Sequence, residues 1–303
     1  MGSILAQEFD QLEVILVDDG STDDTPAEAA RLAASDSRIR IFQQPNQGQS
    51  AAFNRGLAEA RGEFAIMLSD DDVLYPRCLA TVVPVFEENP SVAVVTGEFD
   101  LIDWDNRVLG SHCSPLIELK TFLADHLCNI GVGAAFRVEA ARLAGGWNPQ
   151  YRHVPDMDFW MRMALQGDFR HVPVKLGGWR THTGQVSANA REGSVECARE
   201  HLRCIDEYLE RSDLPDELRA LAGRARASAF IVAAIVTDPG LFEPDRRFLV
   251  LDRISMALDS EGRAGQPEDA LRYLYETAEE RLQLINTLDA DLRMSLSRIE
   301  TLS

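Results

Sequence analysis

The sequence predicts an α/β protein whose mostly parallel sheet is flanked by helices. Apolar segments that suit buried strands recur at nearly regular intervals, and segments with helical periodicity separate them. The expected strands are Val14–Val17, Ile39–Phe42, Phe64–Leu68 and Val92–Val95, and the expected helices cover roughly Asp24–Ala34, Gly48–Ala60 and Pro76–Glu88. Right-handed connections between parallel strands would gather the loops that follow the strands at one edge of the sheet.

The first expected strand ends in an acidic turn. Val14–Val17 is apolar without interruption, as in a strand covered on both faces, and Asp18 and Asp19 follow it directly. Ligands of open α/β sheets bind beyond the carboxyl ends of the strands, so these carboxylates are predicted to bind a nucleobase or a ribose hydroxyl. Alternatively, Asp18, Ser21 and Thr22 form a turn that caps the next helix. The two interpretations are compatible.

A second acidic loop, Ser69–Asp72, follows the third expected strand. Clustered carboxylates repel one another, and a divalent cation would offset that repulsion. Carboxylate oxygens suit Mg²⁺ or Mn²⁺, and phosphate oxygens commonly complete the shell of Mg²⁺. The alternative is an acidic helix N-terminus before Pro76, which the helix dipole favours.

Charge and composition exclude several classes of function. The formal charge of −19 argues against binding nucleic acid through its phosphates and against adsorption to an anionic membrane. Five scattered cysteines without a C-x-x-C pair predict a reduced, cytosolic setting. The most apolar run, Ala227–Val236, is shorter than the roughly 20 residues of a membrane span, and no cationic leader precedes an apolar segment.

The pattern becomes mainly helical near residue 192, which predicts domains at 1–192 and 193–303. Apolar residues from Leu271 to Leu302 follow three- and four-residue steps. Such a stripe predicts either a coiled-coil seam, and hence an oligomer, or a helix packed on its own protein. Pro84 predicts a kink or an early end of the helix expected over Pro76–Glu88.

Several short motifs occur in a fixed order between residues 3 and 190. They are Ser-Ile-Leu-Ala-Gln at 3–7, Val-Asp-Asp-Gly-Ser-Thr-Asp at 17–23, Asn46-Gln47-Gly48 with Asn54-Arg55-Gly56, Gly62-Glu63, Ser-Asp-Asp-Asp-Val at 69–73, Gly145-Gly146-Trp147, Asp156-Met157-Asp158-Phe159-Trp160 and His182. In this ordered set the chain resembles the family 2 glycosyltransferases, which bind nucleotide sugars on a Rossmann-like GT-A fold.

The resemblance implies a role for individual residues. Asp19 resembles the carboxylate at the base or ribose, and Asp70 and Asp71 resemble the acidic pair at the sugar nucleotide. Asp71 matches the metal-binding carboxylate of the D-x-D motif, although Ser69 stands where many members carry the first aspartate. Asp156 matches the general base of an inverting, single displacement. The implied cofactor is Mn²⁺ or Mg²⁺.

These residue types fit the chemistry independently of the resemblance. A metal at Asp71 would stabilise the charge that develops on a diphosphate leaving group. A carboxylate such as Asp156 can remove the proton of an attacking alcohol, although capping of a helix after Pro155 is the alternative. Arg55 is predicted to face either solvent or a phosphate. His182 is predicted to bind the metal or a phosphate, or to be structural.

The chain departs from the family at its start. The resemblance implies a further strand before the helix that contains residues 3–7, whereas Met1 falls inside that helix. We therefore expect an N-terminally truncated domain with unpaired strand edges.

The leading functional hypothesis is transfer of a sugar from a nucleotide-diphosphate donor to a hydroxyl of a glycan, lipid or protein acceptor. The alternative is an inactive nucleotide-sugar-binding or assembly protein derived from such an enzyme. A nucleotidyltransferase or dehydrogenase is disfavoured because no glycine-rich phosphate loop appears. The expected location is cytoplasmic, free or peripheral at the inner face of the membrane.

Overall fold

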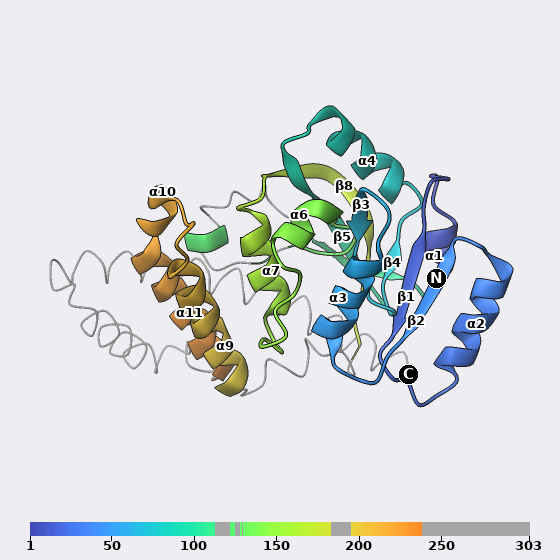
Figure 1. The fold of residues 1–303 in the computed structure, drawn as a ribbon, viewed down its shortest axis with the longest axis horizontal. Coiled ribbons are helices and arrows are strands. Elements are labelled where there is room, and N and C mark those ends of the chain that lie inside the picture. The colour runs from blue at the N-terminus through green and yellow to red at the C-terminus, as the bar shows by residue number, and fades with distance from the viewer. Residues whose placement is uncertain (113–121, 125–127, 129, 183–194, 238–303) are drawn as a thin grey trace, which may run out of the picture. The chain divides into compact units, whose positions relative to one another are not determined.

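The computed structural model describes residues 1–112, 122–124, 128, 130–182 and 195–237 (Figure 1). The chain divides into two compact units. Residues 1–119 and 128–180 form the first, and residues 120–127 and 181–303 form the second. No helix in the described ranges combines the length and the apolar character that a bilayer span requires.

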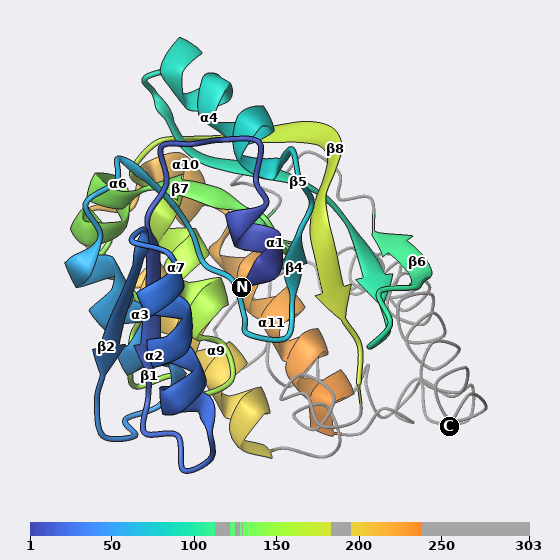
Figure 2. The ribbon, with the colours of Figure 1, turned by 90° about the vertical axis from the view of Figure 1, so that its right-hand side faces the viewer.

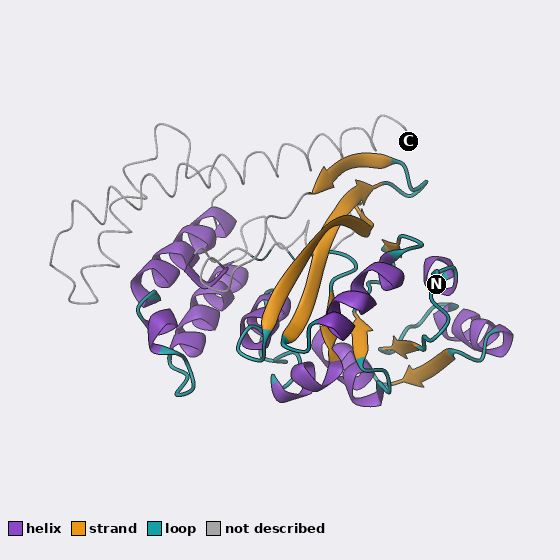
Figure 3. Ribbon diagram, turned by 90° about the horizontal axis from the view of Figure 1, so that it is seen from above, coloured by secondary structure: helices purple, strands orange, loops and turns teal. Residues whose placement is uncertain are grey.

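The first unit begins with a short helix and a small parallel sheet. Helix α1 covers Gly2–Leu5, strands β1 and β2 cover Val14–Asp18 and Ile39–Gln43, and they pair in parallel. Helices α2 (Thr25–Ser35) and α3 (Gln49–Glu59) follow the two strands. Figure 3 shows this pair beside α2, apart from the long strands of the larger sheet. These elements match the expected strands and helices to within two residues.

A second, six-stranded sheet has the order β3-β7-β5-β8-β4, with β6 paired to β5. Its strands are β3 (Phe64–Ile66), β4 (Val73–Leu74), β5 (Val92–Ile102), β6 (Val108–His112), β7 (Ala135–Arg137) and β8 (Asp168–Arg180). Only β5 and β8 pair in parallel, and Figure 2 shows these two strands running in the same direction. The pairs β3–β7, β5–β7, β5–β6 and β4–β8 are antiparallel.

The α/β class is therefore confirmed, but the expectation of a mostly parallel arrangement is wrong for the larger sheet. Strand β3 does not continue the parallel β1–β2 series among the described pairings, because it pairs antiparallel with β7 instead. The partner β7 lies about seventy positions further along the chain, so the local pattern could not indicate its direction.

Strand β5 is the buried centre of the first unit. Val92, Val94 and Val95 are fully buried, and helix α4 (Cys78–Glu88) packs against this part of the sheet. The apolar face of α4 supplies Val82 and Phe86, and Phe86 stacks on Phe64 of β3 with ring centroids 4.6 Å apart. The early helix end predicted at Pro84 is wrong, because α4 continues through it to Glu88.

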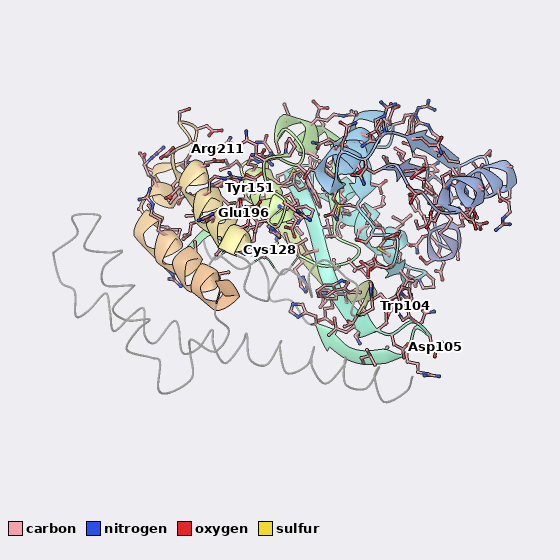
Figure 4. The ribbon with its side chains drawn as sticks, turned by 90° about the horizontal axis from the view of Figure 1, so that it is seen from below. Trp104, Asp105, Cys128, Tyr151, Glu196 and Arg211 are labelled. Atoms are coloured by element: carbon pink, nitrogen blue, oxygen red, sulfur yellow. The ribbon has the colours of Figure 1, made fainter. Side chains whose placement is uncertain are left out.

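Two further helices of the first unit, α6 (Val138–Leu143) and α7 (Pro155–Met163), follow β7. Helix α7 is expected from the sequence and is almost wholly buried after Asp156. The second unit contains α9 (Val195–Leu209), α10 (Asp216–Arg219) and α11 (Ala222–Thr237), with α9 and α11 side by side (Figures 1 and 4). The apolar stripe from Leu271 to Leu302 lies outside the described residues.

Candidate active site

The acidic loop between β3 and β4 uses its three aspartates differently. Asp72 is half-buried and accepts a hydrogen bond from the backbone N–H of Arg180 at 2.8 Å. Burial, reinforced by the charges of Asp71 and Asp70, raises the pKa of Asp72 to about 7 despite this hydrogen bond and the nearby Arg180 charge. Asp70 is exposed and Asp71 half-buried. Asp72 thus anchors the loop, and Asp70 and Asp71 remain the carboxylates suited to a ligand.

Arg180, at the end of β8, fixes this loop against the turn between β5 and β6. Its Nε donates to the carbonyl oxygen of Asp71 at 2.6 Å. Its Nη1 donates to the carbonyl oxygen of Asp103, and its Nη2 donates to Asn106 Oδ1 at 2.7 Å. Because Arg180 is only 6% exposed, it holds the acidic loop and the turn together from a buried position.

The two aspartates that follow the apolar part of β1 accept hydrogen bonds from residues in the neighbouring loops. Asp18 is buried and accepts from the Ser21 backbone at 2.9 Å, and hydrogen bonds from Ser21 hold the pKa of Asp18 below its usual range. Asp19 is half-buried and accepts from Gln44 Nε2 at 2.8 Å and from the backbone of Gln47 and Gly48 at 3.0 and 2.7 Å. Although burial acts in the opposite direction, these donors lower the pKa of Asp19. Both carboxylates are therefore ionised at neutral pH.

The loop after β1, which carries Asp19, and the loop after β2, which leads into α3, approach each other closely. Gly20 has a φ of +82°, and a Cβ placed there would lie 2.7 Å from the backbone nitrogen of Asn46. A side chain at position 20 would push the loops apart. The loops after β1 and β2 thus form one fixed edge.

Asp156 lies in the first turn of α7, near the thiol of Cys128. It is half-buried, and burial raises its pKa despite hydrogen bonds from the Met157 and Asp156 backbone. Burial and, secondarily, the charge of Asp156 raise the pKa of the Cys128 thiol, so the two side chains are neighbours. Three residues further on, a Cβ at Gly131 would overlap the Phe99 ring of β5. This segment therefore links Asp156 to the larger sheet.

The loop before α7 is clamped from two sides. Asn54 Nδ2 donates to the carbonyl oxygen of Trp147, and the Trp147 backbone N–H donates to Asn54 Oδ1, both at 2.8 Å. Arg162 donates to the carbonyl oxygens of Ala144 and Gly146 and pairs with the buried Asp158. The Trp147 ring stacks on Phe53 at 4.8 Å. Helix α3 thereby positions the chain that leads into Asp156.

The structure gives the contacts of Arg55 and the position of His182. Arg55 is half-exposed, pairs with Glu59 at 3.0 Å and lies over the Phe42 ring at 5.2 Å. This geometry fits the solvent-facing interpretation, and phosphate binding by Arg55 stays a prediction. His182 is half-buried and belongs to the second unit. Its metal-binding role also stays a prediction.

The structure places the predicted residues on different elements of the first unit. Asp70 and Asp71 lie in the loop that Arg180 of β8 holds, Asp156 lies in the first turn of α7 near Cys128, and Asp18 and Asp19 lie at the end of the small sheet. In the described ranges, no three His, Cys, Asp or Glu side chains form a metal-binding group. A metal held by one or two carboxylates and by phosphate oxygens would need no such group.

Sequence reasoning missed the function of Arg180 and the separate function of Asp72. A strand-ending arginine gives no local signal of burial, and three consecutive aspartates look equivalent in a sequence. One signal was available, because Asn54 and Gly146 both fall in the ordered motifs and prove to be in contact.

The mixed sheet, the acidic loop and the helix that carries Asp156 define the GT-A fold of glycosyltransferases, and solved structures agree. TarS of S. aureus in complex with UDP-GlcNAc has a TM-score of 0.63 at 16% identity, covering 97% of this chain and 87% of that one. The mannosyltransferase PcManGT of Pyrobaculum calidifontis, in complex with GDP-Man and Mn²⁺, has a TM-score of 0.55 at 17% identity, covering 93% and 81%.

Sequence comparison matches the first part of the chain to a family. Residues 1–143, slightly less than half of the chain, match the family described as Glycosyl transferase family 2. An uncharacterised glycosyltransferase of Nostoc sp. is 34% identical over 206 residues, which are 65% of this chain and 64% of the relative. The chain therefore spans slightly less than two thirds of that relative's length.

Proposed function

We propose that the chain transfers a sugar from a nucleotide-diphosphate donor to a hydroxyl group of an acceptor, with inversion at the anomeric carbon. The observation that carries this proposal is that the aspartates of the acidic loop have different surroundings. Asp72 accepts a hydrogen bond from the Arg180 backbone, whereas Asp70 and Asp71 lie in the loop that follows β3 at the end of the sheet. Ligands of such folds bind at this end.

Asp71 and Asp70 would hold a divalent cation together with the donor diphosphate. Their hard oxygen atoms fit Mn²⁺ or Mg²⁺, and Asp72 has no part in this set because its carboxylate lies against Arg180. When bound, the cation would neutralise the charge that builds up on the departing diphosphate. The solved mannosyltransferase with the same fold was determined with GDP-Man and Mn²⁺, which supports the assignment.

Asp19 and Asp18 would bind the nucleoside end of the donor. Asp19 is ionised and already orients the loop at Gln47 and Gly48, so its remaining acceptor capacity would meet a base N–H or a ribose hydroxyl. Asp18 holds the turn in place through Ser21.

Asp156 would accept the proton of the acceptor hydroxyl as that oxygen attacks the anomeric carbon. The carboxylate is a stronger base in its partly desolvated position, which favours proton removal. The clamp of Asn54 on Trp147 and the pairing of Arg162 with Asp158 keep the start of α7 in position. Proton transfer depends on such fixed placement.

The test is turnover of UDP- and GDP-sugars with Mn²⁺, comparing the full chain with Asp71→Ala and Asp156→Ala. We expect Asp71→Ala to lose nucleotide binding in titration calorimetry. We expect Asp156→Ala to bind the nucleotide normally but to lose turnover. Equal background turnover in all three folded forms would instead favour the second candidate function, a non-catalytic nucleotide-sugar-binding protein.

We also propose a reduced, cytoplasmic setting, because the five cysteines are scattered along the sequence without a C-x-x-C pair. Assembly through the C-terminal apolar stripe remains a prediction, as does the identity of a glycan, lipid or protein acceptor.

A further inference from the structure

The turn between β5 and β6 is built to hold one aromatic side chain at its tip. Asp103 accepts hydrogen bonds from the backbone N–H groups of Asp105 and Arg107 at 2.8 and 2.9 Å. Asn106 adopts a positive φ of 61°, which closes the turn. Trp104 lies inside this fixed turn and is 61% exposed. Figure 4 shows Trp104 and Asp105 at the end of the β5 ribbon.

Arg180 supports the Trp104 ring from the protein side. Its guanidinium carbon lies 5.2 Å from the centre of the ring, within the range of a cation–π interaction. Because Arg180 is buried and the tryptophan is largely exposed, the ring is fixed without being covered. A rigid, exposed aromatic ring loses little conformational entropy when a ligand packs on it.

The same guanidinium group ties the Trp104 ring to the acidic loop. Its Nε, bonded to the carbon beneath the ring, lies 2.6 Å from the Asp71 carbonyl oxygen. The Arg180 guanidinium group therefore contacts both the Trp104 ring and the loop that is proposed to hold the donor diphosphate. The exposed ring lies at the border of the candidate active site.

We propose that Trp104 is the stacking platform for a sugar ring of a glycan acceptor. This inference rests on the proposed function and names the class of its acceptor. The apolar C–H face of a pyranose would pack on the indole, which offers a large amphipathic surface. The carboxylate of Asp105, which follows Trp104 in the turn and is 67% exposed, would accept hydrogen bonds from sugar hydroxyls.

A protein or a membrane fits this surface less well. Val108 is the other strongly exposed apolar residue of the hairpin in the described ranges, so the apolar area is far smaller than the roughly 800 Å² that each partner contributes to a standard protein interface. Asp103 and Asp105 flank the ring, and carboxylates disfavour an anionic lipid surface.

Binding of chitotetraose, cellotetraose and maltotetraose to the full chain tests the proposal by ligand-observed NMR. We expect at least one of them to bind, and Trp104→Ala to weaken that binding about tenfold. Trp104→Phe retains a ring and should weaken it less. The matched control is Leu143→Ala, which truncates a residue 69% exposed on α6 and should change nothing.

A second measurement uses the unaltered chain. The bound oligosaccharide should protect Trp104 from oxidation by N-bromosuccinimide, detected by peptide mass spectrometry, whereas the buried Trp147 should react slowly throughout. Equal affinity of the wild type and Trp104→Ala, no binding of any oligosaccharide, or no protection of Trp104 would overturn the proposal. If Trp104→Ala weakened binding to lipid vesicles but left binding to oligosaccharides unchanged, the proposal would be overturned too.

Binding of Mn²⁺ and UDP is measured in parallel so that the two proposals can fail separately. Trp104→Ala should retain nucleotide binding, because the proposal assigns the indole to the acceptor and the donor to Asp19 and Asp71. If the wild type binds oligosaccharide through Trp104 but binds no nucleotide, the proposed function fails and the stacking platform stands.

Discussion

Replacing Arg180 by methionine should destabilise the first unit far more than an ordinary loss of surface charge. Methionine keeps much of the aliphatic volume but removes the donors to Asp71, Asp103 and Asn106. The backbone N–H that binds Asp72 stays in the variant, so the change isolates the guanidinium group.

The magnitude follows from these contacts. Each lost hydrogen bond costs about 1 kcal/mol net, so loss of the three bonds should lower the free energy of unfolding by about 3 kcal/mol. The lost interaction with the Trp104 ring adds about 0.5 kcal/mol or more.

Arg107→Met is the matched control because it removes one arginine charge from the turn that Arg180 contacts. Arg107 is 62% exposed, and its nitrogen atoms lie 3.2 Å from Asp105 and 3.9 Å from Asp103. Such exposed pairs contribute about 0.2–1 kcal/mol. Urea denaturation of both variants, followed by circular dichroism, measures the difference. A difference below about 0.5 kcal/mol between them would refute the anchoring role of Arg180.

Two further predictions concern the approach to α7. Gly146→Ala should lower the free energy of unfolding by about 3 kcal/mol, because its φ is +68° and the new Cβ would overlap Asn54 Oδ1. Gly145→Ala, with a φ of +85° but only an ordinary contact of its new Cβ with Arg162 Nη1 at 3.7 Å, should cost only about 1 kcal/mol, and equal losses in urea denaturation would contradict the clamp. The raised pKa of Asp156 should place the acidic limb of the kcat/KM profile above the ordinary carboxyl pKa of 3.8, since the base acts when deprotonated and activity rises with pH through its pKa. Asp156→Asn should remove this limb and lower kcat about 100-fold or more, and an unchanged limb would exclude Asp156 as the base.

The local sequence pattern was sufficient to predict the strands and helices at the start of the first unit. The alternating strands and helices from Val14 to Glu59 predicted β1, α2, β2 and α3 to within two residues, because each is set by its own apolar periodicity. Strand β5 was predicted only as far as Val95. Thr96, Gly97 and Glu98 interrupt its apolar run, yet the strand continues to Ile102 because β8 pairs along its whole length.

The candidate site, like the fold, could be predicted only in part from the local sequence. The sequence predicts Asp19 and Asp71 as ligand-binding carboxylates after strands and Asp156 as a base at the start of a helix, and these roles stay predictions. The burial of Asp72 and the contacts of Arg180 depend on elements about a hundred positions apart in the sequence, so no local pattern indicated them. The direction of the β3–β7 pairing has the same non-local origin.

The central claim is that Asp19, Asp71 and Asp156 surround one cation-bound nucleotide sugar. Anomalous diffraction from crystals soaked with Mn²⁺ and UDP tests it most directly. We expect a manganese peak at the Asp71 carboxylate, shared with the diphosphate, with the nucleoside at Asp19 and an open space before Asp156. A manganese ion bound elsewhere, or a nucleotide that reaches neither Asp19 nor Asp71, would contradict the account.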